Sequence, residues 1–252
     1  MKTLLMVTLF LNALVCTSCN KKQRHQTASI QVTALVDITD PRDVLPDAET
    51  LLSFYEFTKD KNIKALFRIT ATTDKLLNPV AEHHLASGDE TEKDNQFDDP
   101  DYREKLVLSF YTNVRQAVSA FNTKAQQDTL LGHSECFRSI AGELTRMVEN
   151  KTDKSLLVVY SDLAENSDLL NVYTKIAPEQ IFKHPDSVLQ KFEATKLLPR
   201  SLSGFTVLFI FQPKNREEDK LFAAMAEMYK KMLSALGAKV IIRSDNPKYL
   251  YP

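Results

Sequence analysis

Residues 155–160 read SLLVVY and residues 205–211 read FTVLFIF, and these two runs decide the fold. Each is an unbroken apolar stretch of strand length, which is typical of a strand buried on both faces of a parallel sheet. Three further strand candidates occur at residues 30–36 (IQVTALV), 63–70 (IKALFRIT) and 238–243 (AKVIIR). A weak edge strand, interrupted by Pro79, is expected within residues 76–85.

Helical patterns separate these strands. Five helices are expected. The first begins at Pro46 and Asp47, the second spans residues 106–121 and the third begins at Ser134. The fourth lies near residues 187–195, and the fifth runs from an N-cap at Asn215 to a stop at Gly237. Because strands that alternate with helices require right-handed crossovers, the sequence predicts a doubly wound α/β domain. We expect a mostly parallel six-stranded sheet with helices on both faces, as in Rossmann-like folds.

The first residues of the chain differ in character from the rest. Lys2 provides a positive charge, residues 4–15 are mostly apolar, and the small residues Thr17 and Ser18 lead to Cys19. This apolar run is too short for a transmembrane helix and has the layout of a signal peptide. We therefore expect residues 1–18 to be a signal segment.

The segment before Cys19 resembles a bacterial lipoprotein signal, although Cys16 stands where such signals usually have Leu. The resemblance implies that Cys19 carries the lipid, palmitate included, and anchors the protein to a membrane. Residues 19–29 then form a polar tether. Asn20 is not the Asp that resembles an inner-membrane retention signal, which favours the outer membrane, facing the periplasm, in a double-membraned host. The alternative is a plain secretory signal that is cut nearby.

Composition restricts the remaining chain to one domain. The protein has 252 residues, 43% of them hydrophobic, and a formal net charge of -1. A near-neutral chain lacks the basic face that nucleic acid requires, so no nucleic-acid partner is expected. We assign residues 30–252 to a single domain with an acidic, solvated insertion at about residues 86–104, which is too poor in apolar side chains to order itself. Cys136, the cysteine of this domain, is expected to be a small buried residue.

Two carboxylates follow strands that we expect to be central. Asp37 ends the strand at residues 30–36, and Asp162 follows the strand at residues 155–160. In doubly wound sheets, ligands bind beyond the carboxyl ends of the strands where the strand order reverses. If the two strands are neighbours, both side chains face one crevice, and a shared divalent cation would relieve their repulsion. Alternatively, either Asp caps a helix or anchors a turn.

The residues around Asp37 resemble the von Willebrand factor A (vWA) family. Its first metal loop reads Asp-x-Ser-x-Ser after a central strand, and residues 36–41 read VDITDP. Asp37 matches the Asp and Thr39 the first hydroxyl, whereas Pro41 replaces the second hydroxyl and has no ligand atom. Ser134 in GHSECF resembles the hydroxyl residue of the second loop, and Asp162 in VVYSDLAENS resembles the Asp of the third. A simple helix N-cap is the alternative role of Ser134.

This resemblance covers about residues 30–245 and implies a degenerate metal-ion-dependent adhesion site. Such a site holds Mg²⁺ through hydroxyls, a carboxylate and waters, and accepts a carboxylate from a partner protein. Its metal residues here would be Asp37, Thr39, Ser134 and Asp162. We therefore expect a membrane-anchored, non-enzymatic domain that binds a protein partner at the cell envelope.

Two alternatives remain. In one, the same fold has an inactive metal site and serves as a structural or assembly component, which Pro41 favours. In the other, the crevice between Asp37 and Asp162 is that of a metal-assisted phosphoesterase. Residues 36–40 (VDITD) superficially resemble the Asp-x-Asp motif of haloacid-dehalogenase phosphatases. Thr39 stands where the second Asp, the general acid, would be, and this counts against the phosphoesterase.

Overall fold

The computed structural model describes residues 27–39, 44–57, 59–72, 80–95, 99–126 and 134–247. The described residues form six strands, which are β1 (Ser29–Asp37), β2 (Lys64–Thr72), β3 (Val80–Leu85), β4 (Lys154–Tyr160), β5 (Phe205–Ile210) and β6 (Lys239–Arg243). The helices are α1 (Ala48–Ser53), α2 (Gly88–Asp94), α3 (Tyr102–Ala125), α4 (Cys136–Glu149), α5 (Ala177–Lys183), α6 (Pro185–Ala194) and α7 (Arg216–Ala235).

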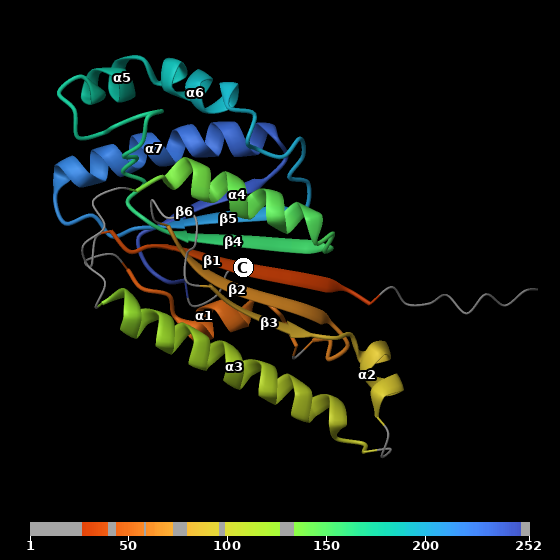
Figure 1. Ribbon diagram of the computed structural model, residues 1–252. Helices are drawn as coiled ribbons and strands as arrows, with labels where there is room; N and C mark the ends of the chain where they lie inside the picture. Colours follow the sequence, from red (N-terminus) through yellow and green to blue (C-terminus); the bar gives the residue numbers. More distant parts are fainter. Residues whose placement is uncertain are drawn as a thin grey trace, which may run out of the picture.

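The strands form one sheet in the order β3-β2-β1-β4-β5-β6 (Figure 1). All neighbouring pairs are parallel except β2 and β3, which are antiparallel. The predicted doubly wound, mostly parallel six-stranded sheet is therefore confirmed. The expected edge strand is β3, which begins at Val80. The strand order reverses between β1 and β4, the two strands whose ends carry the predicted carboxylates.

Helices cover both faces of the sheet. Helices α1 and α3 pack on one face, while α4 and α7 pack on the other beneath an outer layer of α5 and α6 (Figure 1). Two apolar cores result, because the side chains of each buried strand alternate between the two faces. Residues Leu157 and Val159 of β4 belong to the core under α4 and α7, whereas Leu156 and Val158 belong to the core over α1 and α3.

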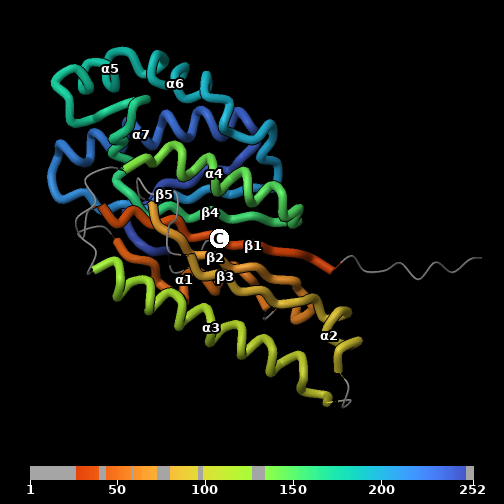
Figure 2. Tube along the Cα trace, in the orientation of Figure 1, coloured from red at the N-terminus to blue at the C-terminus, as the bar shows by residue number. Residues whose placement is uncertain are grey.

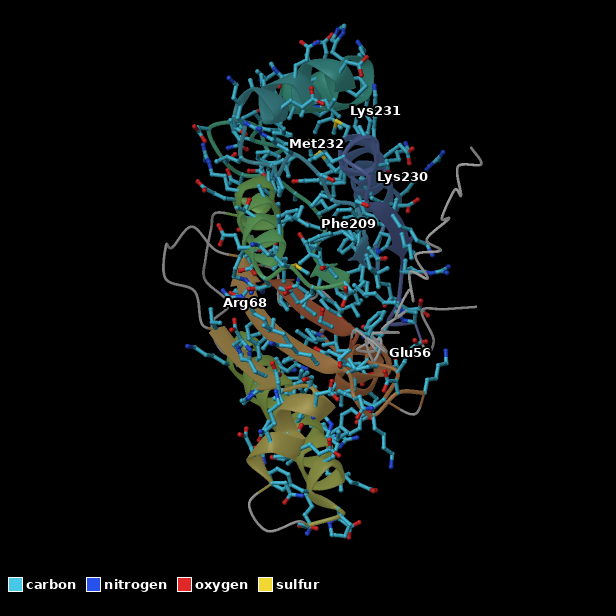
Figure 3. All side chains as sticks on the ribbon, turned by 90° about the vertical axis from the view of Figure 1, so that its right-hand side faces the viewer. Glu56, Arg68, Phe209, Lys230, Lys231 and Met232 are labelled. Carbon is cyan, nitrogen blue, oxygen red and sulfur yellow. The ribbon has the colours of Figure 1, made fainter. Side chains whose placement is uncertain are left out.

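The methionines of α7 pack in the core, as the helical spacing predicts. Met225, Met228 and Met232 are all buried, and Gly237 ends the helix region with a φ of 97°. This positive φ suits glycine, which has no Cβ to clash with the backbone. Figure 3 shows Phe209 of β5 in the interior between the sheet and this helix.

The acidic insertion differs from its prediction. Most side chains of residues 88–94 are exposed, as expected, but the backbone forms helix α2. A capping box explains this, since the Ser87 side chain accepts from Glu90 N and the Glu90 side chain accepts from Ser87 N. Arg103 then fixes the segment by donating to the backbone carbonyls of Lys61, Ile63 and Ala86. Residues 88–94 thus have a helical structure that the sequence analysis did not predict.

Two boundaries also differ from the sequence analysis. Strand β1 begins at Ser29, which we had assigned to the tether, and the Ser29 side chain donates to Asp153 Oδ2 over 2.7 Å. Helix α5 had not been predicted, because only Ala177 and Ile181 are buried in its seven residues.

The signal segment, Cys19 and Pro41 lie outside the described residues. Within the part of the chain that is described, no helix combines the length and apolar character of a membrane span.

Candidate functional site

The candidate site lies where β1 and β4 end. These strands are parallel neighbours, and Val36 pairs with Tyr160 in their register. Asp37 and Ser161 are therefore the next residues along each strand direction. Figure 2 shows the ends of both strands and the start of α4 at the same side of the molecule. The expectation that the two strands are neighbours is confirmed.

The carboxylate of Asp37 collects hydrogen bonds from three segments of the chain. Its Oδ1 accepts from the backbone N and the hydroxyl of Thr39, over 3.0 and 2.7 Å. Its Oδ2 accepts from the hydroxyls of Ser134 and Ser161, over 2.8 and 2.9 Å. We call these four residues the Asp37 cluster. The Asp37 side chain thereby holds together the loop after β1, the start of α4 and the end of β4.

The Asp37 cluster is buried. Asp37 is 3% exposed, Ser134 5% and Ser161 1%, while Thr39 is half-buried. A carboxylate removed from water is costly unless hydrogen bonds replace its hydration. Four donors at these distances supply such bonds, and bonds to a charged acceptor are the stronger kind. The cluster is thus a stable arrangement of the folded chain.

Asp162 anchors the loop that follows β4. Its Oδ1 accepts from Ala164 N over 2.8 Å, which turns the loop that follows β4. Thr39 N makes the equivalent bond to Asp37, so both carboxylates anchor turns, which was the alternative role considered for them. Among the predicted residues, the structure therefore joins Asp37, Thr39 and Ser134 directly and places Asp162 on the adjoining loop.

Ser134 does not act as the helix cap that was its alternative role. The N-cap of α4 is Glu135, which makes no side-chain capping bond, and the Ser134 hydroxyl donates to Asp37 instead. The cap is supplied from another loop, because Phe137 N donates to Glu165 Oε2 over 2.8 Å. Ser134 O in turn accepts from Asn166 N over 2.9 Å. These two bonds fasten the loop after β4 to the start of α4.

Cys136 is buried beside the Asp37 cluster, as expected of a small core residue. Its Sγ lies 3.0 Å from Ser134 Oγ and 3.6 Å from Asp37 Oδ2. Burial raises the pKa of its thiol well above the ordinary value, and the nearby carboxylates of Asp37, Glu165 and Asp162 raise it further. The thiol is therefore kept protonated and unreactive.

Sequence reasoning missed two residues of this region. Ser161 directly precedes Asp162, but only the register of β1 and β4 shows that it lies beside Asp37. Glu165 carries no sequence signal, yet it is fully buried, and burial raises its pKa to about 7. Its Oε1 and the hydroxyl of Tyr229 are both buried without a hydrogen-bond partner among the described residues.

The Asp37 cluster offers hydroxyl and carboxylate oxygens, which are the type of ligand that Mg²⁺ binds. Mg²⁺ prefers hard oxygen ligands, and a hydroxyl that donates its proton to Asp37 retains lone pairs for a cation. Thr39, Ser134 and the Asp162 carboxylate are the groups that would hold it. In the described ranges, no group of three or more His, Cys, Asp and Glu side chains gathers as a metal site. A cation here would thus depend on hydroxyls more than on carboxylates.

A separate apolar groove of about 550 Å³ lies between α7 and the layer of α5 and α6. Ile181, Leu189 and Met228 line it. At its mouth, Lys231 pairs with Asp186 over 2.8 Å and Lys230 pairs with Glu227 over 3.4 Å (Figure 3 labels both lysines). These charges neutralise one another and do not select a ligand of either sign.

No protein-family model matches the chain, and a search of curated proteins finds no match.

The first prediction concerns the cost of weakening the Asp37 cluster. We expect Asp37→Asn to lower the free energy of unfolding by about 1–3 kcal/mol, because an amide replaces the charged acceptor of buried donors. Urea denaturation measures this change. Asp168→Asn is the matched control, since Asp168 is an exposed carboxylate of the loop after β4, and it should leave stability unchanged. Equal stability of both variants and the wild type would show that the cluster is not stabilising.

Proposed function

We propose that this chain is an exported lipoprotein, anchored through Cys19, whose vWA-like domain binds a protein partner at the cell envelope without catalysing a reaction. The proposed binding site is the region beyond the carboxyl ends of β1 and β4, around the Asp37 cluster, and we call this region the crevice. One observation carries this proposal: hydroxyls from three separate segments converge on one buried carboxylate at the reversal point of the sheet. This is the place where doubly wound sheets bind ligands.

The positions of Thr39, Ser134 and Asp162 along the chain support the vWA resemblance. Thr39 follows β1, Ser134 precedes α4 and Asp162 follows β4, which is the order of loops that the resemblance requires. Mg²⁺ bound by these groups would supply a positive charge that attracts a carboxylate of the partner. The chain itself provides the fixed hydroxyls and the buried negative charge of Asp37 that would orient the cation.

The burial of Asp37 favours a second candidate function. Both of its carboxylate oxygens are already satisfied by the chain, and the side chain is 3% exposed. The cluster can therefore stabilise the fold with no cation at all. In that case the domain is a structural or assembly component that binds its partner through another part of its surface.

A metal titration separates these two functions. We expect saturable binding of Mg²⁺ or Mn²⁺ to the wild type by calorimetry, and binding at least about tenfold weaker in Asp162→Asn, because one carboxylate ligand loses its charge. Asn keeps the oxygen that accepts from Ala164 N, so the turn is preserved. Asp168→Asn, on the same loop and exposed, should bind metal like the wild type. An absence of binding at millimolar metal would contradict the metal-dependent function and favour the structural one.

The lipid anchor has its own test. We expect the wild-type chain, expressed in a bacterium, to incorporate a clickable palmitate analogue and to sediment with membranes, since the lipid holds it on the bilayer. Cys19→Ala should lose both properties. Cys136→Ser is the control, because Cys136 is buried in the domain and should not affect labelling. Labelling that persists in Cys19→Ala would contradict the assignment of the anchor.

A further inference from the structure

Glu165 occupies a position that the proposed function does not explain. It lies on the loop after β4, is fully buried, and uses one carboxylate oxygen to accept from Phe137 N in the first turn of α4. Its other oxygen is buried and makes no hydrogen bond of normal geometry with the described residues, and the same holds for the hydroxyl of Tyr229 on α7. Buried polar atoms in folded proteins nearly always have partners, so each exception calls for an explanation.

The surroundings of Glu165 disfavour a negative charge. Burial is the main cause that raises its pKa to about 7, and Glu135 raises it further, whereas Ser167, the Phe137 amide and Arg138 oppose the shift. Glu165 in turn raises the pKa values of Cys136 on α4 and Tyr229 on α7, so both groups lie within its electrostatic reach. The protonated carboxyl has an O–H that can donate a hydrogen bond, which the carboxylate cannot.

Hydrogen bonds connect the loop that carries Glu165 to Ser134 in the Asp37 cluster. Its backbone carbonyl accepts from Val172 N over 3.0 Å, and the next residue, Asn166, donates from its N to Ser134 O over 2.9 Å. The loop after β4 therefore touches α4 through the Glu165 carboxyl and through Ser134. A movement of this loop toward solvent would strain these bonds and pull on Ser134.

We propose that Glu165 is a pH-responsive positioning residue that docks the loop after β4 onto the start of α4 when protonated and loosens it when ionised. This inference rests on the proposed function, because it concerns the crevice that we assign to partner binding. In the protonated form, the loop holds Ser134 in the Asp37 cluster. In the ionised form, the buried charge is relieved when the loop moves toward solvent, and the crevice opens.

The direction of the pH effect follows from linkage. The pKa of Glu165 is about 7 in the folded chain against an ordinary value of 4.5, so the folded state favours the proton. The stability that this group contributes is fully present below its unfolded pKa and is lost as the pH rises through about 7. Docking of the loop is therefore strongest at mildly acidic pH.

Amide hydrogen exchange in full-length Cys19→Ala, which lacks the lipid, tests the inference. We expect the protection factors of Phe137, Asn166 and Val172 amides, corrected for intrinsic exchange, to fall at least about tenfold between about pH 6 and pH 8.5. Val114 in α3 is the internal reference and should keep its protection at both pH values. The same result is expected without metal or partner, so a failure of metal binding leaves this test intact.

Glu165→Gln provides the matched variant. Glutamine keeps the shape and can accept from Phe137 N, but it does not titrate. We expect the three amides to stay equally protected at both pH values in this variant. The inference is overturned if protection in the wild-type Glu165 chain does not change with pH, if Val114 loses protection equally, or if Glu165→Gln shows the same loss. The comparison with Val114 decides the matter even if Glu165→Gln does not fold.

Discussion

The hydrogen bonds to the Asp37 carboxylate connect the features of this protein that matter most for function. Asp37 ends β1 at the point where the strand order reverses, and its two oxygens accept from Thr39, Ser134 and Ser161. Without this acceptor, three buried or half-buried hydroxyls would lose the carboxylate to which they donate, and the loops around the crevice would lose their common anchor. A buried carboxylate is retained only when such donors replace water. The same bonds therefore explain both the order of the crevice and the presence of a negative charge inside it.

The sequence was most informative where apolar residues are continuous. The runs at residues 155–160 and 205–211 correctly predicted β4 and β5, because central parallel strands are buried on both faces. Helix α2 could not be predicted from hydrophobicity, since its order comes from the capping box of Ser87 and Glu90 and from the bonds of Arg103 to distant carbonyls. The capping box is a local pattern that the sequence does contain, whereas the bonds of Arg103 depend on which loops meet in space.

The candidate site could be predicted only in part, because some of its contacts are local in the sequence and others join distant segments. Asp37 and Thr39 are two residues apart, so their bond is local and visible in the motif. Ser134 was placed by its resemblance to a hydroxyl loop and does meet Asp37. Ser161 depends on the register of β1 with β4, and Glu165 depends on the loop after β4 reaching α4. Asp162 was expected to line the crevice, and its carboxylate accepts a hydrogen bond from Ala164 N that anchors the turn after β4. The same carboxylate is therefore compatible with metal binding and with a purely structural role.

We propose that partner binding takes place in the crevice beyond β1 and β4, and that a cation is held there by the hydroxyls of the Asp37 cluster. Paramagnetic broadening by Mn²⁺ in an NMR spectrum of the protein tests this proposal, because the broadening shows which residues lie near the cation. We expect selective loss of the amide signals of Thr39, Cys136 and Leu163 at substoichiometric Mn²⁺, with the signals of β6 retained. Broadening centred on the acidic residues of α2, or on no defined site, would contradict the account.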